Sequence, residues 1–231
     1  MPRETLSRDQ IVTAALELLD AEGLEGMNMR ALGKHLGSAA TAVYWHVGSR
    51  DSLIALAADR AWAEVELPDP AAVGWRTAAH QMATSEYAML TRHPWLVQAF
   101  GSYQLYGPGK ARHDDHSIAV YETAGFAGAE ANQATSAVFT YVLGNALGLA
   151  ATASFTRKLG RGGGDIQALL QASRAEVLEV AAQFPLLRAR LELPSAGYGA
   201  APEGSFVFGL QAVLDGLEAR LATQAKSGAG R

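Results

Sequence analysis

The chain has 231 residues, of which 49% are hydrophobic and 18% are charged, with a net charge of −4 and no cysteine. This composition predicts a soluble globular protein rather than a disordered one. The lack of cysteine excludes disulfides, thiol catalysis and cysteine-ligated zinc. No apolar run reaches the ~18 residues of a membrane span, because Asn145 and several glycines interrupt the best candidate. The polar N-terminal residues show no signal-peptide pattern, so we expect a cytoplasmic protein without a membrane partner.

The negative net charge does not exclude a DNA-binding protein, because DNA meets only the surface that faces it. Basic residues are frequent in the first fifty positions, namely Arg3, Arg8, Arg30, Lys34 and Arg50. Acidic residues lie among them, so a local basic face could form, whereas an overall basic domain could not.

The first forty residues predict two helices. Ser7-Arg-Asp-Gln10 has the form of a capping box, so the first helix should begin near Arg8. Gly23 is placed to end it. Asn28 is the expected N-cap of a short second helix, which should stop at Gly37.

A third short helix is expected over 39–46, with Ser38 as its cap, and Ser49 should cap a longer helix over 50–66. Two short helices joined by a glycine turn and braced by a longer helix form a helix-turn-helix. Pro68-Asp-Pro70 ends this block and is the best linker candidate.

Beyond the linker the sequence carries helical periodicity and almost no strand signals. The expected helices are 72–91, 94–106, 111–123, 130–158, 166–184, a further turn or two over 185–191, and 206–225. Glycine-rich stretches at 160–164 and 193–204 read as loops. We therefore predict an all-α protein with a helix-turn-helix three-helix module over 1–50, a connecting helix over 51–66, a helical ligand-binding and dimerisation body over 67–225, and a disordered tail over 226–231.

The third helix carries the functional hypothesis. A helix-turn-helix places the N-terminal residues of its second helix against base edges in the major groove. Here that helix begins with small residues, and Thr41 could hydrogen-bond a base or a phosphate. Tyr44, His46 and Arg50 follow at spacings that suit phosphate contacts. On spacing alone, the alternative is an ordinary helix in which Tyr44 and Trp45 are core aromatics.

Three runs carry a resemblance to a known family: Arg30-Ala-Leu-Gly-Lys-His-Leu-Gly37, Ser38-Ala-Ala-Thr-Ala-Val-Tyr-Trp-His-Val47 and Ser49-Arg-Asp-Ser-Leu53. They resemble the DNA-binding module of the TetR family of transcriptional regulators, and of its tetracycline-repressor subgroup in particular. The resemblance implies that Trp45 is a core residue bracing the module. It also implies a DNA-contact set of Arg30, Ala39, Ala40, Thr41, Ala42, Tyr44, His46 and Arg50. The three alanines differ from the subgroup, so its operator sequence is not carried over.

The last helix also resembles that subgroup, in Phe206-Val-Phe-Gly-Leu210 and Leu214-Asp-Gly-Leu217-Glu218. In this family the last helix and an earlier long helix meet their counterparts from a second chain in a four-helix bundle. The resemblance and the apolar faces of the two helices together predict a homodimer. The interface expected from them is Leu143, Ala146, Ala150, Leu210, Val213, Leu214, Leu217 and Leu221. The alternative is that both apolar stripes are buried within one monomer.

Aromatic and polar residues between the linker and the bundle suit the walls of a small-molecule pocket. These candidates are Tyr87, His93, Trp95, Phe100, Tyr103, Tyr121, Phe139 and Asn145. For each of them alone, ordinary core packing is the alternative. The histidine-glycine-threonine stretch that holds drug-bound magnesium in the tetracycline-repressor subgroup is missing, so magnesium-tetracycline is not the expected ligand. We expect no cofactor.

Two histidines, His113 and His116, share a helix face and could suggest a metal site. A solvated helix start is the preferred interpretation, and no metal is expected. The hypothesis is a repressor that binds palindromic operator DNA and is released by a small-molecule inducer. An activator or a ligand-independent regulator of the same family is the nearer alternative. A helical enzyme using His80, His93, His113 or His116 is the remote one.

Overall fold

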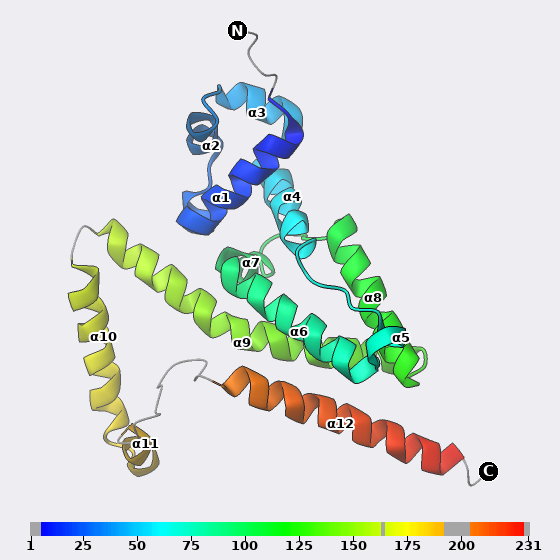
Figure 1. The fold of residues 1–231 in the computed structure, drawn as a ribbon. Helices are drawn as coiled ribbons and strands as arrows, with labels where there is room; N and C mark the ends of the chain where they lie inside the picture. The colour runs from blue at the N-terminus through cyan, green and yellow to red at the C-terminus, as the bar shows by residue number, and fades with distance from the viewer. Residues whose placement is uncertain (1–5, 163–164, 192–203, 229–231) are drawn as a thin grey trace.

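The computed structural model describes residues 6–162, 165–191 and 204–228, and all regular secondary structure in these ranges is helical (Figure 1). The helices are α1 Arg8–Gly26, α2 Met29–His35, α3 Ala40–Val47, α4 Arg50–Trp62, α5 Pro70–Val73, α6 Trp75–Arg92, α7 Pro94–Ala99, α8 Pro108–Ala124, α9 Ala129–Arg161, α10 Ile166–Ala181, α11 Pro185–Leu191 and α12 Ser205–Gly228. This confirms the all-α prediction.

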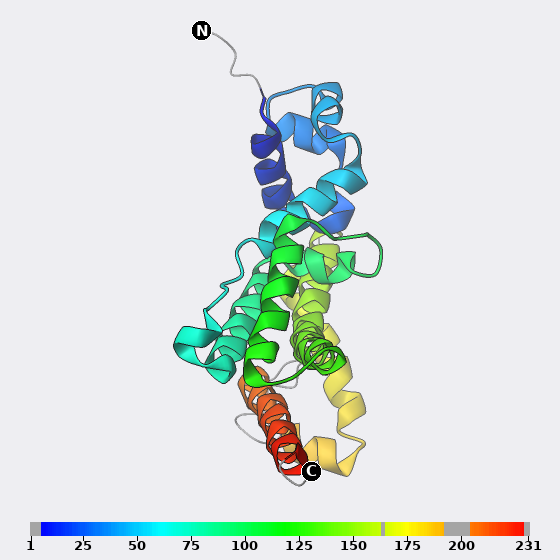
Figure 2. The ribbon, with the colours of Figure 1, turned by 90° about the vertical axis from the view of Figure 1, so that its right-hand side faces the viewer.

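Helices α1–α3 form a small headpiece at one end of the molecule (Figures 1 and 2). The expected capping box is present, since Ser7 accepts from the backbone of Gln10 and the Gln10 side chain accepts from the backbone of Ser7. Gly23 interrupts α1 with a φ of +69° instead of ending it, and the helix continues to Gly26. Asn28 caps α2 as predicted. The predicted cap Ser38 is wrong, because Ala39 is the N-cap of α3 and makes no side-chain capping bond.

Helix α4 begins at Arg50 behind the predicted cap Ser49 and leads from the headpiece into the body (Figure 1). It packs against α1 on one side and against α8 on the other. It ends at Trp62, one turn before the predicted end at Glu66, and an irregular segment leads to α5. Along the chain, the headpiece is therefore joined to the body by one helix of 13 residues.

The body is built around α9, a helix of 33 residues that packs against α6, α7, α8 and α12. By length and composition this helix could cross a membrane. Within the body, however, its buried side chains, such as Val138 and Val142, meet the other helices at the centre of the hydrophobic core. Helix α9 extends to Arg161, so the expected glycine loop begins later than predicted, and residues 163–164 lie outside the described ranges.

Helices α10 and α11 stand away from the rest of the body as an arm that starts at the far end of α9 (Figure 1). Several large apolar side chains on the arm are exposed, including Val180, Phe184 and Leu186. The expected loop over 193–204 lies almost wholly outside the described residues. Helix α12 continues to Gly228, so the predicted disordered tail is wrong for 226–228, while 229–231 are not described.

Candidate DNA interface and effector site

The turn between α2 and α3 holds these two helices close together. The backbone N–H of Ser38 donates to the carbonyl of Gly33 at 2.8 Å. A Cβ atom on Gly33 would lie 2.8 Å from the Ser38 carbonyl oxygen and 3.1 Å from the Ala40 nitrogen. Gly37 adopts a φ of +59°, a conformation that favours glycine. The geometry of this turn therefore requires glycine at positions 33 and 37.

Helix α3 buries one face and presents the other to solvent. Val43 and Val47 are buried one helical turn apart. On the opposite face Thr41, Tyr44 and Trp45 are all exposed. Trp45 is 83% exposed, so its predicted role as a core residue is wrong. The spacing of the two valines could have revealed this, because residues 41 and 45 lie opposite them on a helical wheel.

The other predicted DNA contacts differ in their exposure. Arg30 and Ala39 are exposed, whereas Ala40, Ala42 and His46 are half-buried. His46 lies with its ring 4.9 Å from the Trp45 ring, in an edge-on arrangement.

Arg50 is directed into the molecule and not toward the exposed face of α3. Its guanidinium donates to the carbonyls of Met27 at 2.8 Å and Leu24 at 2.6 Å, near the end of α1. It also donates to the Tyr103 hydroxyl at 2.7 Å. Arg50 therefore ties α4 to the headpiece and to the body, and we leave it out of the proposed DNA contacts. Tyr103, a predicted pocket residue, lies at this same joint.

A second set of bonds fixes the headpiece to the body at Asp20. The Trp95 indole N–H donates to the Asp20 carboxylate at 2.8 Å, and Nδ1 of His93 lies 2.7 Å from the same oxygen. Nε2 of His93 lies 3.2 Å from Glu64, which also pairs with Arg92. His93 and Trp95, predicted as pocket residues, thus belong to the joint.

His93 is almost fully buried, and burial alone would lower its pKa. The hydrogen bonds and negative charges of Asp20 and Glu64 outweigh that effect and raise the pKa above its usual value of 6.5. The charged form of the ring is therefore favoured between two carboxylates.

The far end of α9 makes a third connection to the headpiece. Arg161 donates to the Glu25 carboxylate at 2.7 Å and to the Glu22 carbonyl at 3.0 Å. Helices α4, α7 and α9 all reach the headpiece near the end of α1, so its orientation depends on the arrangement of the body.

A cluster of polar side chains is buried where α4, α6 and α8 meet. We call Trp62, Glu86, His113 and Tyr121 the interior cluster. The His113 ring lies 4.7 Å from the Trp62 ring, and its Nε2 lies 3.8 Å from the Glu86 carboxyl group. Each of the four residues is at most 3% exposed. His113 is therefore a buried residue, and its predicted place in a solvated helix start is wrong.

Each member of the interior cluster has a buried polar atom without a hydrogen-bond partner among the described residues: Trp62 Nε1, Glu86 Oε1, His113 Nε2 and the Tyr121 hydroxyl. An unpaired buried polar group costs about 1–3 kcal/mol. Four such groups together would cost a large part of the ~5–15 kcal/mol that stabilises a typical protein. Polar atoms of an ordered water or of a bound ligand would remove this cost, so the cluster is a candidate binding site.

Burial also sets the protonation states in the cluster. It raises the pKa of Glu86 to about 8, although the nearby Lys110 opposes the shift, so this carboxyl is mostly protonated at neutral pH. Burial lowers the pKa of His113, which keeps its ring neutral. Burial and the proximity of Glu86 raise the pKa of Tyr121. All three groups are therefore uncharged at pH 7.

Lys110 and aromatic rings flank the cluster. The Lys110 ammonium pairs with Asp114 and lies 4.7 Å from the Trp62 ring centroid and 5.2 Å from that of Phe139. Phe100 and Phe139 pack 5.9 Å apart, each within 6.4 Å of Trp62. Phe100 and Phe139 are thus the predicted pocket residues that the structure brings together beside Trp62, whereas the Tyr121 ring lies 6.4 Å from the rings of Trp75 and Phe126.

Two predicted pocket residues lie elsewhere. Tyr87 stacks on Phe206 of α12 at 4.0 Å, and Asn145 donates to the carbonyl of Tyr141 on its own helix. Sequence reasoning missed Trp62 and Glu86. The apolar periodicity of α4 explains why Trp62 is buried, but a lone glutamate within α6 gives no comparable signal.

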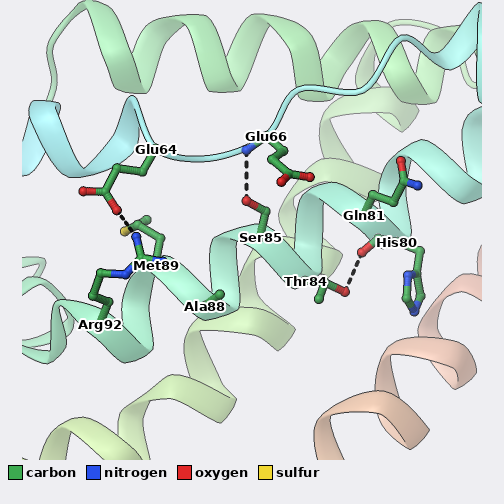
Figure 3. Close-up of a pocket in the computed structure, with 9 residues that line it drawn as sticks. All are labelled: Glu64, Glu66, His80, Gln81, Thr84, Ser85, Ala88, Met89 and Arg92. Atoms are coloured by element: carbon green, nitrogen blue, oxygen red, sulfur yellow. Dashed lines mark hydrogen bonds and ion pairs between the residues drawn. The ribbon is translucent and has the colours of Figure 1, made fainter.

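A separate open groove of about 410 Å³ runs between residues 64–66 and the outer face of α6 (Figure 3). Polar and charged side chains line it together with Ala88 and Met89, and the Glu66 backbone N–H donates to Ser85 across it at 2.9 Å. Arg92 already pairs with Glu64 there. His80, a histidine of the enzyme alternative, lies at the end of this groove near α12 and far along α6 from His93 (Figure 3).

Most of the predicted dimer residues face the core of their own chain. Ala146 and Ala150 of α9 and Leu210, Leu214 and Leu217 of α12 are buried in the hydrophobic core of the chain. Leu143, Val213 and Leu221 are partly buried against the same core. The alternative that the stripes are buried within one monomer therefore applies to the five buried residues.

Other apolar side chains of these two helices remain uncovered. Phe208 is 80% exposed, and Val207 and Leu147 are also exposed. These residues lie on the faces of α12 and α9 that the chain itself leaves open.

Comparison with known proteins assigns both parts of the chain. Residues 11–57 match the family described as bacterial regulatory proteins, tetR family, and residues 67–221 match the tetracyclin repressor-like C-terminal domain. The repressor DrrR1 of Streptomyces coeruleorubidus is 31% identical over 96% of this chain and 80% of its own length. An HTH-type regulator of Saccharopolyspora erythraea is 35% identical over 61% of this chain, but the match spans only 59% of that relative.

The fold also matches a solved structure, that of the Streptomyces coelicolor TetR family protein ActR in complex with actinorhodin. The TM-score is 0.71 and the identity 28%, and the match covers 93% of this chain and 96% of ActR. Sequence, headpiece geometry and overall fold agree, and the chain belongs to the TetR family of transcriptional regulators.

Proposed function

We propose that this protein is a ligand-responsive repressor, which binds a palindromic operator as a homodimer and releases it when a small molecule binds in the body. The observation that carries the proposal is the combination of an exposed face on α3 with unpaired polar atoms buried in the body. Buried polar groups nearly always have hydrogen-bond partners, so these atoms mark a place where a polar ligand could bind.

DNA binding rests on the exposed face of α3. Thr41, at its N-terminal end, is placed to meet base edges, while Tyr44 and Trp45 lie one turn further along toward the flanking backbone. Arg30 on α2 is also exposed and adds a positive charge beside this face. The small side chains of Ala39 and Ala42 allow close approach and can contact thymine methyl groups, whereas Ala40 packs against the core of the headpiece.

Dimerisation rests on the exposed apolar residues of α9 and α12. A solvent-exposed phenylalanine such as Phe208 is costly to keep in water, and a second copy of the same face would cover it. A two-fold dimer also presents two α3 helices to successive major grooves, which suits a palindromic site.

Effector binding is assigned to the interior cluster. The related protein ActR has been crystallised with actinorhodin, which supports a small-molecule effector for this chain as well. Trp62 belongs to the cluster and is the last residue of α4, whose first residue, Arg50, holds the end of α1. A ligand that displaces Trp62 would move α4 and thereby the headpiece. Repression is relieved if the ligand binds the DNA-incompetent arrangement more tightly.

A gel-shift assay tests the proposal, using the full-length protein and the DNA upstream of its own gene at low salt. We expect a specific complex that Tyr44→Ala weakens and Tyr106→Ala, a change of an exposed tyrosine in the body, does not. Actinorhodin is the first compound to test for release. Failure of the wild-type protein to bind any fragment of that DNA would overturn the proposal. A complex that no small molecule dissociates would favour a ligand-independent regulator.

A further inference from the structure

The hydrogen-bonding capacity of the interior cluster defines what a ligand must offer. The Trp62 indole can only donate. Nδ1 of His113 lies 3.3 Å from the Asp114 carboxylate, which can only accept, so Nδ1 carries the proton and Nε2 is left as an acceptor. The Tyr121 hydroxyl can do either. A ligand that satisfies the cluster therefore carries at least one acceptor and one donor.

The charges around the cluster are already balanced. Lys110 and Asp114 form an ion pair, and Glu86, His113 and Tyr121 are uncharged at neutral pH. A charged ligand would lose its hydration and find no free counter-charge among the described residues of the cluster. The charge pattern thus favours a neutral molecule.

The side chains packed next to the unpaired atoms are aromatic. Trp62 belongs to the cluster itself, and Phe100 and Phe139 pack beside it. Flat rings gain both apolar burial and ring–ring contact in such surroundings.

On the basis of the proposed function, we propose that the effector is an uncharged aromatic molecule with an acceptor for Trp62 Nε1 and a donor for His113 Nε2. Glu86 stays protonated in this complex and serves as a neutral hydrogen-bonding group. A cationic ligand would instead require Glu86 to ionise, so the charge of the ligand and the state of Glu86 are coupled.

Calorimetry with matched naphthalene probes tests the ligand class on the full-length protein. The uncharged probe carries an acetyl group and a hydroxymethyl group on opposite rings. Three further probes each differ from it in one group. The first lacks the hydroxymethyl group, the second has a carboxylate in place of the acetyl group, and the third has an aminomethyl cation in place of the hydroxymethyl group. We expect the uncharged probe to bind at least about tenfold more tightly than each of the three other probes. Equal or tighter binding of either ion, or no binding of the uncharged probe at about 1 mM, would overturn the proposal.

The pH dependence of binding tests the role of Glu86, because neither polar group of the uncharged probe titrates between pH 7 and 9. The titratable groups around Glu86 all lie on α8, namely Lys110, His113, Asp114 and Tyr121. Helices α4 and α9 contribute the uncharged Trp62 and Phe139. The carboxyl loses its proton as the pH rises through about 8. We therefore expect the affinity to fall, approaching about tenfold per pH unit above that value.

Glu86→Gln keeps a neutral donor and acceptor of the same shape, so its affinity at pH 7 should match that of the wild type and should not fall at higher pH. Glu86→Leu should lose at least about tenfold in affinity. A wild-type affinity that rises with pH, or a Glu86→Gln protein that no longer binds although its circular dichroism spectrum is unchanged, would refute a protonated Glu86.

The outcomes for ligand class and for repression can be separated. Calorimetry measures ligand binding in the absence of DNA. The gel shift of Glu86→Leu, run without ligand, measures the DNA binding of a protein whose effector site is impaired. If the wild type fails to bind operator but binds the uncharged probe, the proposed function fails and the ligand class stands. If operator binding is intact and only charged probes bind or dissociate it, the ligand class fails and the repressor stands.

Discussion

Replacement of Asp20 by alanine tests the joint between headpiece and body. The carboxylate accepts from Trp95, which is fully buried, and lies 2.7 Å from Nδ1 of His93, which is 2% exposed. Asp20→Ala would leave both nitrogens buried without this partner. At about 1–3 kcal/mol for each of the two unpaired groups, the expected loss of unfolding free energy is roughly 2–6 kcal/mol. The Asp20 side chain is 32% exposed, so solvent screening places the expected value in the lower half of that range.

The loss should depend on pH in a defined direction. The pKa of His93 is raised in the folded protein, so its contribution to stability is fully present below the ordinary value of about 6.5 and is lost as the pH rises through the higher folded value. Asp20→Ala removes the nearer of its two carboxylates. The difference in unfolding free energy between wild type and variant should therefore be larger at pH 5.5 than at pH 8.5.

Urea denaturation, followed by circular dichroism at both pH values, measures this difference. Glu122→Ala, which removes an exposed carboxylate from α8, is the matched control and should change stability by less than about 0.5 kcal/mol. Asp20→Asn should retain the bond from Trp95 and lose only part of the stability. An Asp20→Ala protein as stable as the control, or a difference that grows as the pH rises, would refute the account of this joint.

Three further changes test the turn, the recognition helix and the dimer face. Gly33→Ala places a methyl group 2.8 Å from the Ser38 carbonyl oxygen and should cost about 1–3 kcal/mol in chemical denaturation, whereas Gly101→Ala, whose nearest contact is 4.0 Å, should cost less. Tyr44→Phe should weaken binding to all DNA sequences and Thr41→Ala should change the preferred sequence, as measured by competition gel shifts; unchanged affinity in both would contradict the placement of α3. If the proposed dimer forms through this face, Phe208→Glu should give a folded monomer in light scattering, whereas Gln211→Glu, an exposed change on the same helix, should leave a dimer.

Local chemistry explains which parts of the fold were predictable. Caps such as Ser7, Asn28 and Ser49 act on backbone groups within three residues, so their role can be recognised in sequence. The capping prediction failed at Ser38, because the tight turn uses its backbone N–H to reach Gly33 and starts the helix one residue later. Helix ends were displaced where tertiary contacts decide them, as at Trp62, which packs against α8 and α9.

The sites were harder to predict, because they join residues far apart in sequence. Asp20 meets Trp95, and Glu86 meets His113, through the packing of different helices. Aromatic composition could indicate Phe100, Tyr121 and Phe139, but it could not separate them from Trp95, which has a similar character and lies at the joint. Apolar periodicity predicted that residues such as Leu210 are buried, but it could not decide whether the same chain or a second copy buries them.

The arrangement of α4 and α9 explains how one interior site could control a distant DNA-binding surface. Trp62 of α4 belongs to the interior cluster and Phe139 of α9 packs beside it, while Arg50 of α4 and Arg161 of α9 hold the end of α1. The 13 residues of α4 span roughly 18 Å at 1.5 Å per residue, which is too short and rigid to absorb a shift at Trp62. A displacement of Trp62 alone would strain the bonds of Arg50, because α9 would still hold Glu25 in place. Under the proposed mechanism, a ligand would release DNA by moving α4 relative to α9, and a molecule inserted beside Trp62 and Phe139 would act on both helices at once.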